Sequence, residues 1–252
     1  MTEQILLIDQ GNTRLKWVLA SNGGIREESA DRGDFEAFAQ ACRSGRLGIP
    51  GRVVFSSVAG SQASQELANF CESQWSCKAQ QLQSTVESHT FTEHKVQSGY
   101  CEPESLGVDR WLAILGAVAH YGSPVVVWDL GTATTIDAVD RKGQHIGGMI
   151  YPGPDTMLRA LDRDTKLKVP EDLSTAGIAP GRSTGDCIRN GVFAAQVGAL
   201  NQFLRNMQEQ TDVSPMLVVT GGGATGIMPR LDFDFIYDPW LVFRGMLKEG
   251  VR

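Results

Sequence analysis

A short pattern that occurs twice constrains this chain more than any other feature of its sequence. Residues 125–137 read Val-Val-Val-Trp-Asp-Leu-Gly-Thr-Ala-Thr-Thr-Ile-Asp, and residues 5–16 read Ile-Leu-Leu-Ile-Asp-Gln-Gly-Asn-Thr-Arg-Leu-Lys. In both, an apolar run suited to a buried strand ends in an aspartate, and a glycine follows two residues later. The two aspartates, Asp9 and Asp129, are 120 residues apart (129 − 9), and the two glycines share that offset. This predicts an internal duplication.

Each copy of the pattern has the chemistry of a phosphate and metal cradle. A glycine lets backbone N–H groups approach a ligand because no Cβ blocks the way. An aspartate at the end of a strand can hold a cation, either directly or through water. A buried strand that leaves through a polar turn has the same residues, and short glycine motifs often occur by chance. The recurrence at one fixed offset is what favours ligand binding.

The order of the predicted elements gives both halves one plan, a three-strand meander followed by helices that alternate with further strands. Because the loop after Asp9 joins two strands and enters no helix, P-loop and Rossmann turns are excluded. We predict two α/β domains, residues 1–122 and 123–252, each offering one Asp-x-Gly hairpin to a shared cleft. The alternative that the closing helix packs back on the first half stays open. Strands are expected at 5–8, 15–20, 25–30, 52–58, 125–128, 134–139, 145–150, 216–219 and 233–237, with one more within 77–97 and a hairpin turn at 21–24. Helices are expected at 34–44, 61–71, 111–120, 156–161, 183–208 and 240–248, and the core residues of the long one include Val192, Ala195, Val197 and Phe203.

Composition narrows the class of protein. The net charge is −6 and no Lys/Arg-rich run occurs, which argues against a nucleic-acid partner. The five cysteines form no Cys-x-x-Cys, so reduced cytosolic thiols are expected rather than disulfides or a zinc site. His89 and His94 are expected to be exposed loop residues. The apolar run at 112–119 is too short to span a bilayer, and the N-terminus is not a signal peptide. We therefore expect a cytoplasmic protein with no membrane contact.

Two further stretches suit contact with a ligand. Gly-Val-Asp-Arg at 107–110 precedes an apolar helix. An aspartate there is often only a residue that favours the helix dipole, and its neighbour Arg110 can be simply solvated, so the residues alone favour a structural role. Thr-Gly-Gly-Gly-Ala at 220–224 follows a buried strand. A tight loop explains it, but such a turn can also pass under a purine and ribose without steric conflict.

This set of motifs resembles that of the actin, sugar kinase and Hsp70 nucleotide-binding superfamily. Residues 9–13 resemble its first phosphate motif, 129–135 its second and 220–224 its adenosine motif. Within that group the chain is similar to the type III pantothenate kinases, through motifs that occur in order along nearly the whole chain. They are Asp-x-Gly-Asn-Thr-x-x-Lys at 9–16, Gly-Val-Asp-Arg at 107–110, Asp-x-Gly-Thr-Ala-Thr-Thr-x-Asp at 129–137, Gly-Gly-x-Ile-x-Pro-Gly at 147–153, Thr-x-x-x-Ile-x-x-Gly at 184–191 and Thr-Gly-Gly at 220–222. Each motif is weak alone, and the ordered set is specific.

The resemblance implies an α/β fold of two duplicated actin-like (ribonuclease H-like) domains with the active site in the cleft between them. It also implies ATP-dependent phosphorylation of the primary hydroxyl of pantothenate to 4'-phosphopantothenate, the first committed step toward coenzyme A. A homodimer is implied, and feedback by coenzyme A is not.

The resemblance also implies roles for individual residues. Asp109 would be the general base for the pantothenate hydroxyl. Asp9 would position Mg²⁺, through water, and Asp129 would bind a monovalent cation, K⁺ or NH₄⁺. Pantothenate contacts are expected from Tyr100, Gly107, Val108, Asp109, Arg110 and Thr184, the last of them near the dimer interface. ATP contacts are expected from Asp9, Gln10, Gly11, Asn12, Thr13, Arg14, Leu15, Lys16, Thr132, Gly221 and Gly222.

Two other functions stay open at this point. One is a kinase for a sugar or acetate on the same scaffold, against which the element at 107–110 and the small size of the chain argue. The other is a nucleotide-binding regulator without catalysis. The presence of Asp9, Asp109 and Asp129 together argues against it, and the absence of a basic patch argues against direct DNA binding.

Overall fold

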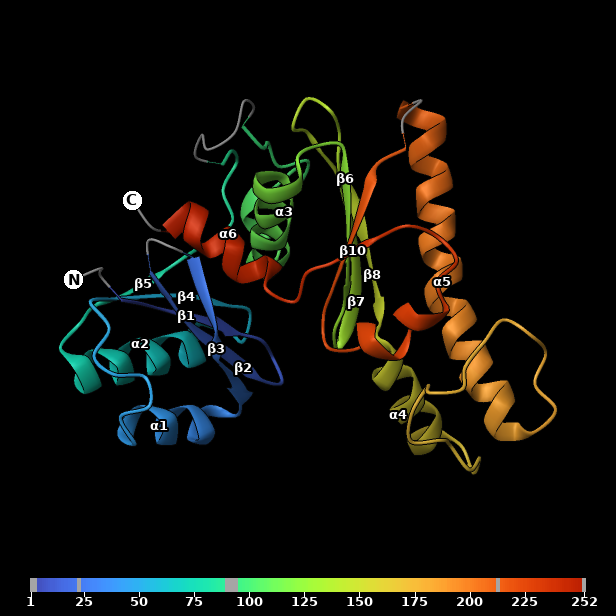
Figure 1. The fold of residues 1–252 in the computed structure, drawn as a ribbon, viewed down its shortest axis with the longest axis horizontal. Helices are drawn as coiled ribbons and strands as arrows, with labels where there is room; N and C mark the ends of the chain where they lie inside the picture. The colour runs from blue at the N-terminus through green and yellow to red at the C-terminus, as the bar shows by residue number, and fades with distance from the viewer. Residues whose placement is uncertain (1–3, 22–23, 89–94, 212–213, 251–252) are drawn as a thin grey trace. The chain divides into compact units, whose positions relative to one another are not determined.

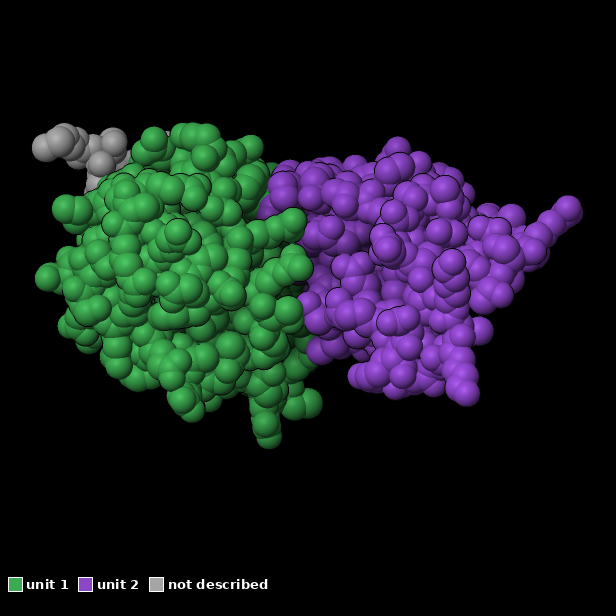
Figure 2. All heavy atoms as spheres, turned by 90° about the horizontal axis from the view of Figure 1, so that it is seen from below, with its two compact units in different colours: residues 1–120, 240–252 green, residues 121–239 purple. Residues whose placement is uncertain are grey.

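The computed structural model divides the chain into two compact units, which Figure 2 shows in separate colours. Unit 1 comprises Met1–His120 and Trp240–Arg252, and unit 2 comprises Tyr121–Pro239. The structure describes residues 4–21, 24–88, 95–211 and 214–250. Two predictions fall wholly or partly outside them, the exposed loop histidines His89 and His94 and the turn at 21–24. Among the described residues, no helix combines the length and the apolar character needed to cross a membrane.

Unit 1 is built on a five-stranded mixed sheet whose strand order is β3-β2-β1-β4-β5 (Figure 1). Its strands are β1 (Ile5–Gln10), β2 (Leu15–Ser21), β3 (Gly24–Gly33), β4 (Arg52–Ser57) and β5 (Ala79–Gln81). The first three form an antiparallel meander, whereas β4 runs parallel to β1 and β5 to β4. Leu6 and Ile8 pack in one cluster with residues of α1 (Phe35–Arg43) and α2 (Ser61–Trp75). Because both faces of β1 are covered, this strand is a continuous apolar run.

Unit 2 repeats the topology of unit 1 with the strand order β10-β9-β6-β7-β8. Its strands are β6 (Val125–Leu130), β7 (Ala133–Val139), β8 (His145–Pro152), β9 (Met216–Thr220) and β10 (Ile236–Tyr237). The meander is again antiparallel, and β9 is parallel to the first strand of the unit, as β4 is in unit 1. The long helix α5 (Thr184–Thr211) packs along one face of this sheet, and α4 (Pro154–Asp164) follows β8 (Figure 1). The predicted duplication and the α/β, actin-like fold class are therefore confirmed.

The last helix, α6 (Leu241–Gly250), departs from the predicted division at 122/123 because it lies in unit 1. It packs on β1, β3 and β4 and crosses α3 (Val108–Tyr121) at very close range (Figure 1). A Cβ on Gly116 would collide with the Leu241 carbonyl oxygen, and a Cβ on Gly245 with the Leu112 carbonyl oxygen. This glycine-lined crossing explains why α6 completes unit 1 instead of continuing unit 2.

Three smaller predictions about unit 2 need correction. The strand expected at 233–237 is only Ile236–Tyr237, because Phe233 and Phe235 pack against the core as part of a loop. Ala195, expected in the core, is exposed on α5. The helix expected at 156–161 already begins at Pro154, whose fixed φ suits the first helical position.

All five cysteines are free thiols, in agreement with the sequence-based expectation. Burial raises the pKa of Cys42 to about 12 and that of Cys71 to about 12, so neither thiol ionises near neutral pH.

Candidate active site

The carboxylate of Asp9 lies at the end of β1, where two neighbouring strands supply its partners. Asp9 is paired with Lys16 on β2 and with Ser56 on β4. The Ser56 hydroxyl donates a hydrogen bond of 3.0 Å to Asp9 Oδ1, and Lys16 Nζ lies 3.8 Å from Oδ2. Asp9 is only 7% exposed, whereas the Lys16 side chain is about half exposed. The strand register thus holds a buried carboxylate at a fixed place, with the half-exposed cation of Lys16 beside it.

The loop after Asp9 presents backbone and side chains to solvent. Gly11 N donates to Arg14 O at 3.0 Å, which closes the turn. Asn12, Thr13 and Arg14 are exposed. Gln10 is buried and its Nε2 donates to the Ala63 carbonyl at 3.4 Å, while its Oε1 finds no hydrogen-bond donor among the described residues.

Asp109 stands in the first turn of α3, close enough to Asp9 for their charges to interact. Arg110 N donates to Asp109 Oδ1 at 2.8 Å. Burial raises the pKa of the Asp109 carboxyl above its ordinary value, and the negative charge of Asp9 raises this pKa further. The hydrogen bond from the Arg110 backbone and the Arg110 charge act in the opposite direction. A carboxylate with a raised pKa is a stronger proton acceptor, which is the property that a general base requires.

Arg110 and Tyr100 form a second polar group beside Asp109. Arg110 is buried, and its Nη1 donates to the Tyr100 hydroxyl at 2.6 Å. The guanidinium carbon also lies 5.5 Å from the centroid of the Tyr100 ring. Gly107 precedes this turn, and a Cβ there would approach Asp109 Oδ1 to 2.7 Å. Glycine at this position therefore leaves the Asp109 carboxylate room.

In unit 2, the loop from Gly131 to Ala133 is held by the turn between β8 and α4. Gly131 N donates to Ala133 O at 3.1 Å. The Thr132 carbonyl accepts two hydrogen bonds, from Gly153 N at 3.0 Å and from Thr156 Oγ1 at 2.7 Å. A Cβ on Gly153 would collide with the Gly131 carbonyl oxygen. Only glycine allows the turn to approach the loop this closely.

The glycine turn after β9 supports the same loop from the neighbouring strand. Asp129 on β6 is paired with Thr220 on β9. Gly223 N donates to the Leu130 carbonyl at 2.7 Å, and Gly221 adopts a positive φ of 91°. A Cβ on Gly221 would collide with Asp129 Oδ1. The aspartate and the glycine turn are thus in direct contact.

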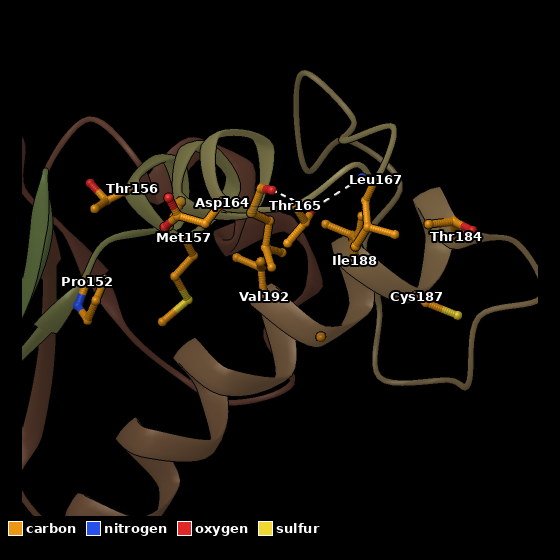
Figure 3. A pocket seen from close by; sticks show the side chains of 13 residues that line it. Pro152, Thr156, Met157, Asp164, Thr165, Leu167, Thr184, Cys187, Ile188 and Val192 are labelled. Carbon is orange, nitrogen blue, oxygen red and sulfur yellow. Dashed lines mark hydrogen bonds between the residues drawn. The ribbon is translucent and has the colours of Figure 1, made fainter.

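An apolar groove of about 680 Å³ lies between α4 and the N-terminal half of α5 (Figure 3). Thr184, the first residue of α5, lines one end of it. Met157 from α4 and Ile188 and Val192 from α5 form much of its wall (Figure 3). Pro152 and Thr156 line it as well, so the groove shares residues with the turn that holds Thr132.

Comparison with known proteins decides the family. A family model described as type III pantothenate kinase matches residues 5–206. The chain belongs to the type III pantothenate kinase family. It is 32% identical over 259 residues to a type III pantothenate kinase from Alcanivorax borkumensis, covering 98% of this chain and 99% of that one. It is 34% identical over 245 residues to one from Azoarcus sp., covering 96% and 89%.

Solved structures of other proteins share the fold of this chain. A Baf family protein from Campylobacter jejuni superposes with a TM-score of 0.64 at 21% identity, covering 97% of this chain and 98% of that one. The activator of 2-hydroxyisocaproyl-CoA dehydratase from Clostridium difficile, with bound ADPNP, gives a TM-score of 0.55 at 10% identity, covering 99% and 92%. These likenesses establish the shared fold.

Sequence reasoning assigned no role to three residues that shape the site of this kinase. Ser56 bonds Asp9, Gly153 contacts the Gly131 loop, and Gln196 is a buried amide on α5. Gln196 left a signal, because it is polar on the apolar stripe that Val192 and Leu200 mark at four-residue spacing. Ser56 and Gly153 depend on strand register and close approach, which local patterns do not specify.

Proposed function

We propose that this chain transfers the γ-phosphoryl group of ATP to the primary hydroxyl of pantothenate, forming 4'-phosphopantothenate and ADP in the cytoplasm, as the first committed step toward coenzyme A. The observation that carries the proposal is the half-buried Asp109 carboxylate, which interacts with the charge of Asp9 and has a raised pKa, at the start of α3 in a member of the type III pantothenate kinase family. Asp109 accepts the hydroxyl proton while the oxygen forms its bond to the γ-phosphorus. The bond between that phosphorus and the β–γ bridging oxygen breaks, and ADP leaves.

The rest of the rate enhancement comes from positioning the reactants and neutralising the phosphate charge, because the phosphoryl-transfer transition state is loose. From unit 1, the hairpin from Asp9 to Lys16 offers exposed donors at Asn12 and Thr13 and the cation of Lys16. From unit 2, Thr132 donates to a phosphate, and Gly221 and Gly222 leave room for the adenosine. The remaining proposed ATP contacts of the first hairpin are Gln10, Gly11, Arg14 and Leu15.

The donor sets of the two aspartates fit the ions that the family implies. Magnesium that accompanies ATP is usually held by one or two carboxylates together with phosphates and water, so Asp9 with its Ser56 support is a sufficient protein anchor. Asp129 is half-buried and lies against the glycine turn at Gly221. It suits a monovalent cation, K⁺ or NH₄⁺, whose charge offsets that of the phosphates when bound.

Tyr100, Gly107, Val108 and Arg110 are the proposed pantothenate contacts beside Asp109. The hydrogen bond from the buried Arg110 to the half-buried Tyr100 supports this, because a preorganised guanidinium and phenol can bind the polar end of a small acid without further reorganisation. Thr184 is proposed to contact pantothenate near the interface of a homodimer. The apolar character of the groove at α4 and α5 is consistent with coverage by a second copy.

A coupled ADP-release assay tests the proposed function. With Mg²⁺ and K⁺ present, we expect turnover with pantothenate and none with common sugars or acetate. Absence of turnover with pantothenate under these conditions would overturn the proposal in favour of a binding protein without catalysis. Replacement of K⁺ by Na⁺ tests the proposed cation site on its own. Equal activity in both salts would reject a K⁺ or NH₄⁺ site at Asp129 and would not affect the proposed kinase function.

A further inference from the structure

Gln196 is a polar side chain enclosed by an apolar core. It lies on α5 between Val192 and Leu200 and is 0% exposed. The residues around it on the helix belong to the main apolar cluster of unit 2. A buried primary amide is unfavourable unless its hydrogen bonds are satisfied, so the contacts of Gln196 indicate why an amide is kept here.

The oxygen and the nitrogen of the Gln196 side-chain amide each form a hydrogen bond with a segment next to the Gly131–Ala133 loop. Gln196 Oε1 accepts from Thr134 Oγ1 at 2.8 Å, and Nε2 donates to the Pro152 carbonyl at 2.9 Å. Thr134 is fully buried and is the residue on β7 that pairs with Leu130 across the hairpin. The amide orientation is fixed because a carbonyl oxygen can only accept, so the NH₂ group must face Pro152.

The Pro152 end of this bridge continues directly to the loop. Gly153, the next residue, donates its N–H to the Thr132 carbonyl, and its lack of a Cβ allows contact with Gly131. The Tyr151 hydroxyl additionally donates to the backbone carbonyl of Gln196 at 3.5 Å. Gln196 therefore links α5 to two segments: Thr134, in the strand that follows the loop, and Pro152–Gly153, which supports the loop through the Thr132 carbonyl.

We propose that Gln196 is a positioning residue that fixes the second phosphate loop, residues 131–133, in the geometry that binds nucleotide. This rests on the proposed function, in which Thr132 contacts ATP. Gln196 touches no substrate itself. It acts through Thr134 on one side and through Pro152 and Gly153 on the other, and it sets the loop before ATP arrives.

The same bridge connects the loop to the groove between α4 and α5. Met157, whose sulfur lies 3.5 Å from Gln196 Nε2, lines that groove together with Pro152. An occupant of the groove would therefore contact residues that Gln196 also contacts.

The test compares Gln196→Met, which keeps the volume and removes both bonds, with Leu200→Ala, which weakens the same core one turn away. Nucleotide dissociation constants are measured by calorimetry without pantothenate, and KM values for ATP and pantothenate by turnover. We expect Gln196→Met to weaken ATP binding by about tenfold, in the range typical of residues that support a ligand-contacting group, and to change the KM of pantothenate by less than about twofold. Leu200→Ala should lower the Tm with ATP affinity unchanged.

Substitutions of Thr134 test the same proposal without depending on whether the Gln196 variant folds. Thr134→Val should weaken ATP binding in the same direction, and Thr134→Ser, which keeps the hydroxyl, should restore it. Wild-type ATP affinity in folded Gln196→Met or in Thr134→Val, or an equal loss in Leu200→Ala, overturns the positioning role. A wild-type protein that binds no ATP instead overturns the proposed function.

Discussion

In unit 1 the Asp-x-Gly hairpin leaves four residues, 11–14, between the paired Gln10 and Leu15, whereas in unit 2 it leaves three, 131–133, between Leu130 and Thr134. The first hairpin is distinguished by charge. Its aspartate is buried beside Ser56 and Lys16, and Asp109 adds a second negative charge.

The second hairpin is distinguished by backbone support. The Thr132 carbonyl accepts from Gly153 and Thr156, and the Leu130 carbonyl accepts from Gly223. In the first hairpin, the Gln10 carbonyl accepts from Val58, and Gly11 closes on Arg14 within the loop itself. A duplicated motif has thus diverged so that one copy is organised by side-chain charge and the other by close backbone packing.

Asp109→Asn tests the charged side of this comparison and should have the largest effect. Loss of a general base lowers kcat by about 10²–10⁴-fold. Because the pKa of Asp109 is raised in the fold, its ionised form costs stability at neutral pH, and this cost disappears below the ordinary pKa. The variant should therefore be at least as stable as wild type at pH 7, with the difference shrinking toward pH 4. Turnover assays give kcat, and thermal unfolding at pH 7 and pH 4 gives the stability difference. A kcat near that of wild type would reject the role of Asp109 as the general base.

Gly153→Ala tests the backbone side. The new Cβ would collide with the Gly131 carbonyl oxygen and press on that of Thr132, so we expect a loss of about 3 kcal/mol in unfolding free energy and weaker ATP binding. Gly11→Ala is the matched change in the first hairpin. Its Cβ would lie 3.3 Å from Arg14 O, which should cost about 1 kcal/mol or less. Equal losses of stability in denaturant titrations of the two variants would remove the distinction between the hairpins.

Ser56→Ala removes the buried hydroxyl that donates to Asp9. A hydrogen bond to a charged group contributes about 1.5–3 kcal/mol, and its loss should also raise the Mg²⁺ concentration needed for half-maximal activity. Ser64→Ala is the control, because the Ser64 hydroxyl donates to the carbonyl of Gly60, the residue before α2, whereas that of Ser56 donates to Asp9. That variant should lose about 1 kcal/mol and keep the Mg²⁺ dependence of wild type. A Mg²⁺ response that is the same in both variants argues against Asp9 as the anchor.

The smallest expected effect is the contribution of Asp9 to the pKa of Asp109, which can be measured in the pH profile of kcat/KM. A base must be ionised to act, so activity falls as pH drops through its pKa. In wild type this acid limb should lie above the ordinary aspartate value of 3.8, because burial and Asp9 both raise the pKa of Asp109. Asp9→Asn removes one of these causes, so its normalised profile should move to lower pH. A profile that stays in place would show that Asp9 does not contribute to the pKa of Asp109.

Much of this architecture was accessible from local patterns. The strands β1 and β6, the aspartates that end them and the glycine turn at 220–224 follow from apolar runs and punctuation, which are local properties. The helix α3 was expected from residue 111 for the same reason, and it begins three residues earlier, at Val108. Local patterns do not predict the register between strands, or which charged groups come together from distant parts of the sequence. The contact of Ser56 with Asp9 spans 47 residues, and the pKa of Asp109 depends on a carboxylate 100 residues earlier (109 − 9).

Which of the two units α6 packs on was left open by the sequence, for a related reason. Its apolar face is evident in the sequence, but an apolar face does not specify which sheet it covers. The close crossing of α6 with α3, at Gly245 of α6 and Gly116 of α3, decides that question. The expected core position of Ala195 was wrong because small residues are found on either face of a helix, and Gln196 beside it took the buried place.

The return of α6 to unit 1 also sets an order of events during synthesis. Unit 2 is an insertion between α3 and α6, so all of its residues leave the ribosome before the helix that covers β1 and β4. Unit 2 can therefore finish folding first, although unit 1 is begun first. Until residues 240–250 emerge, the apolar face that carries Ile5 and Leu7 has no α6 over it, and the nascent chain must be kept from aggregating through that face.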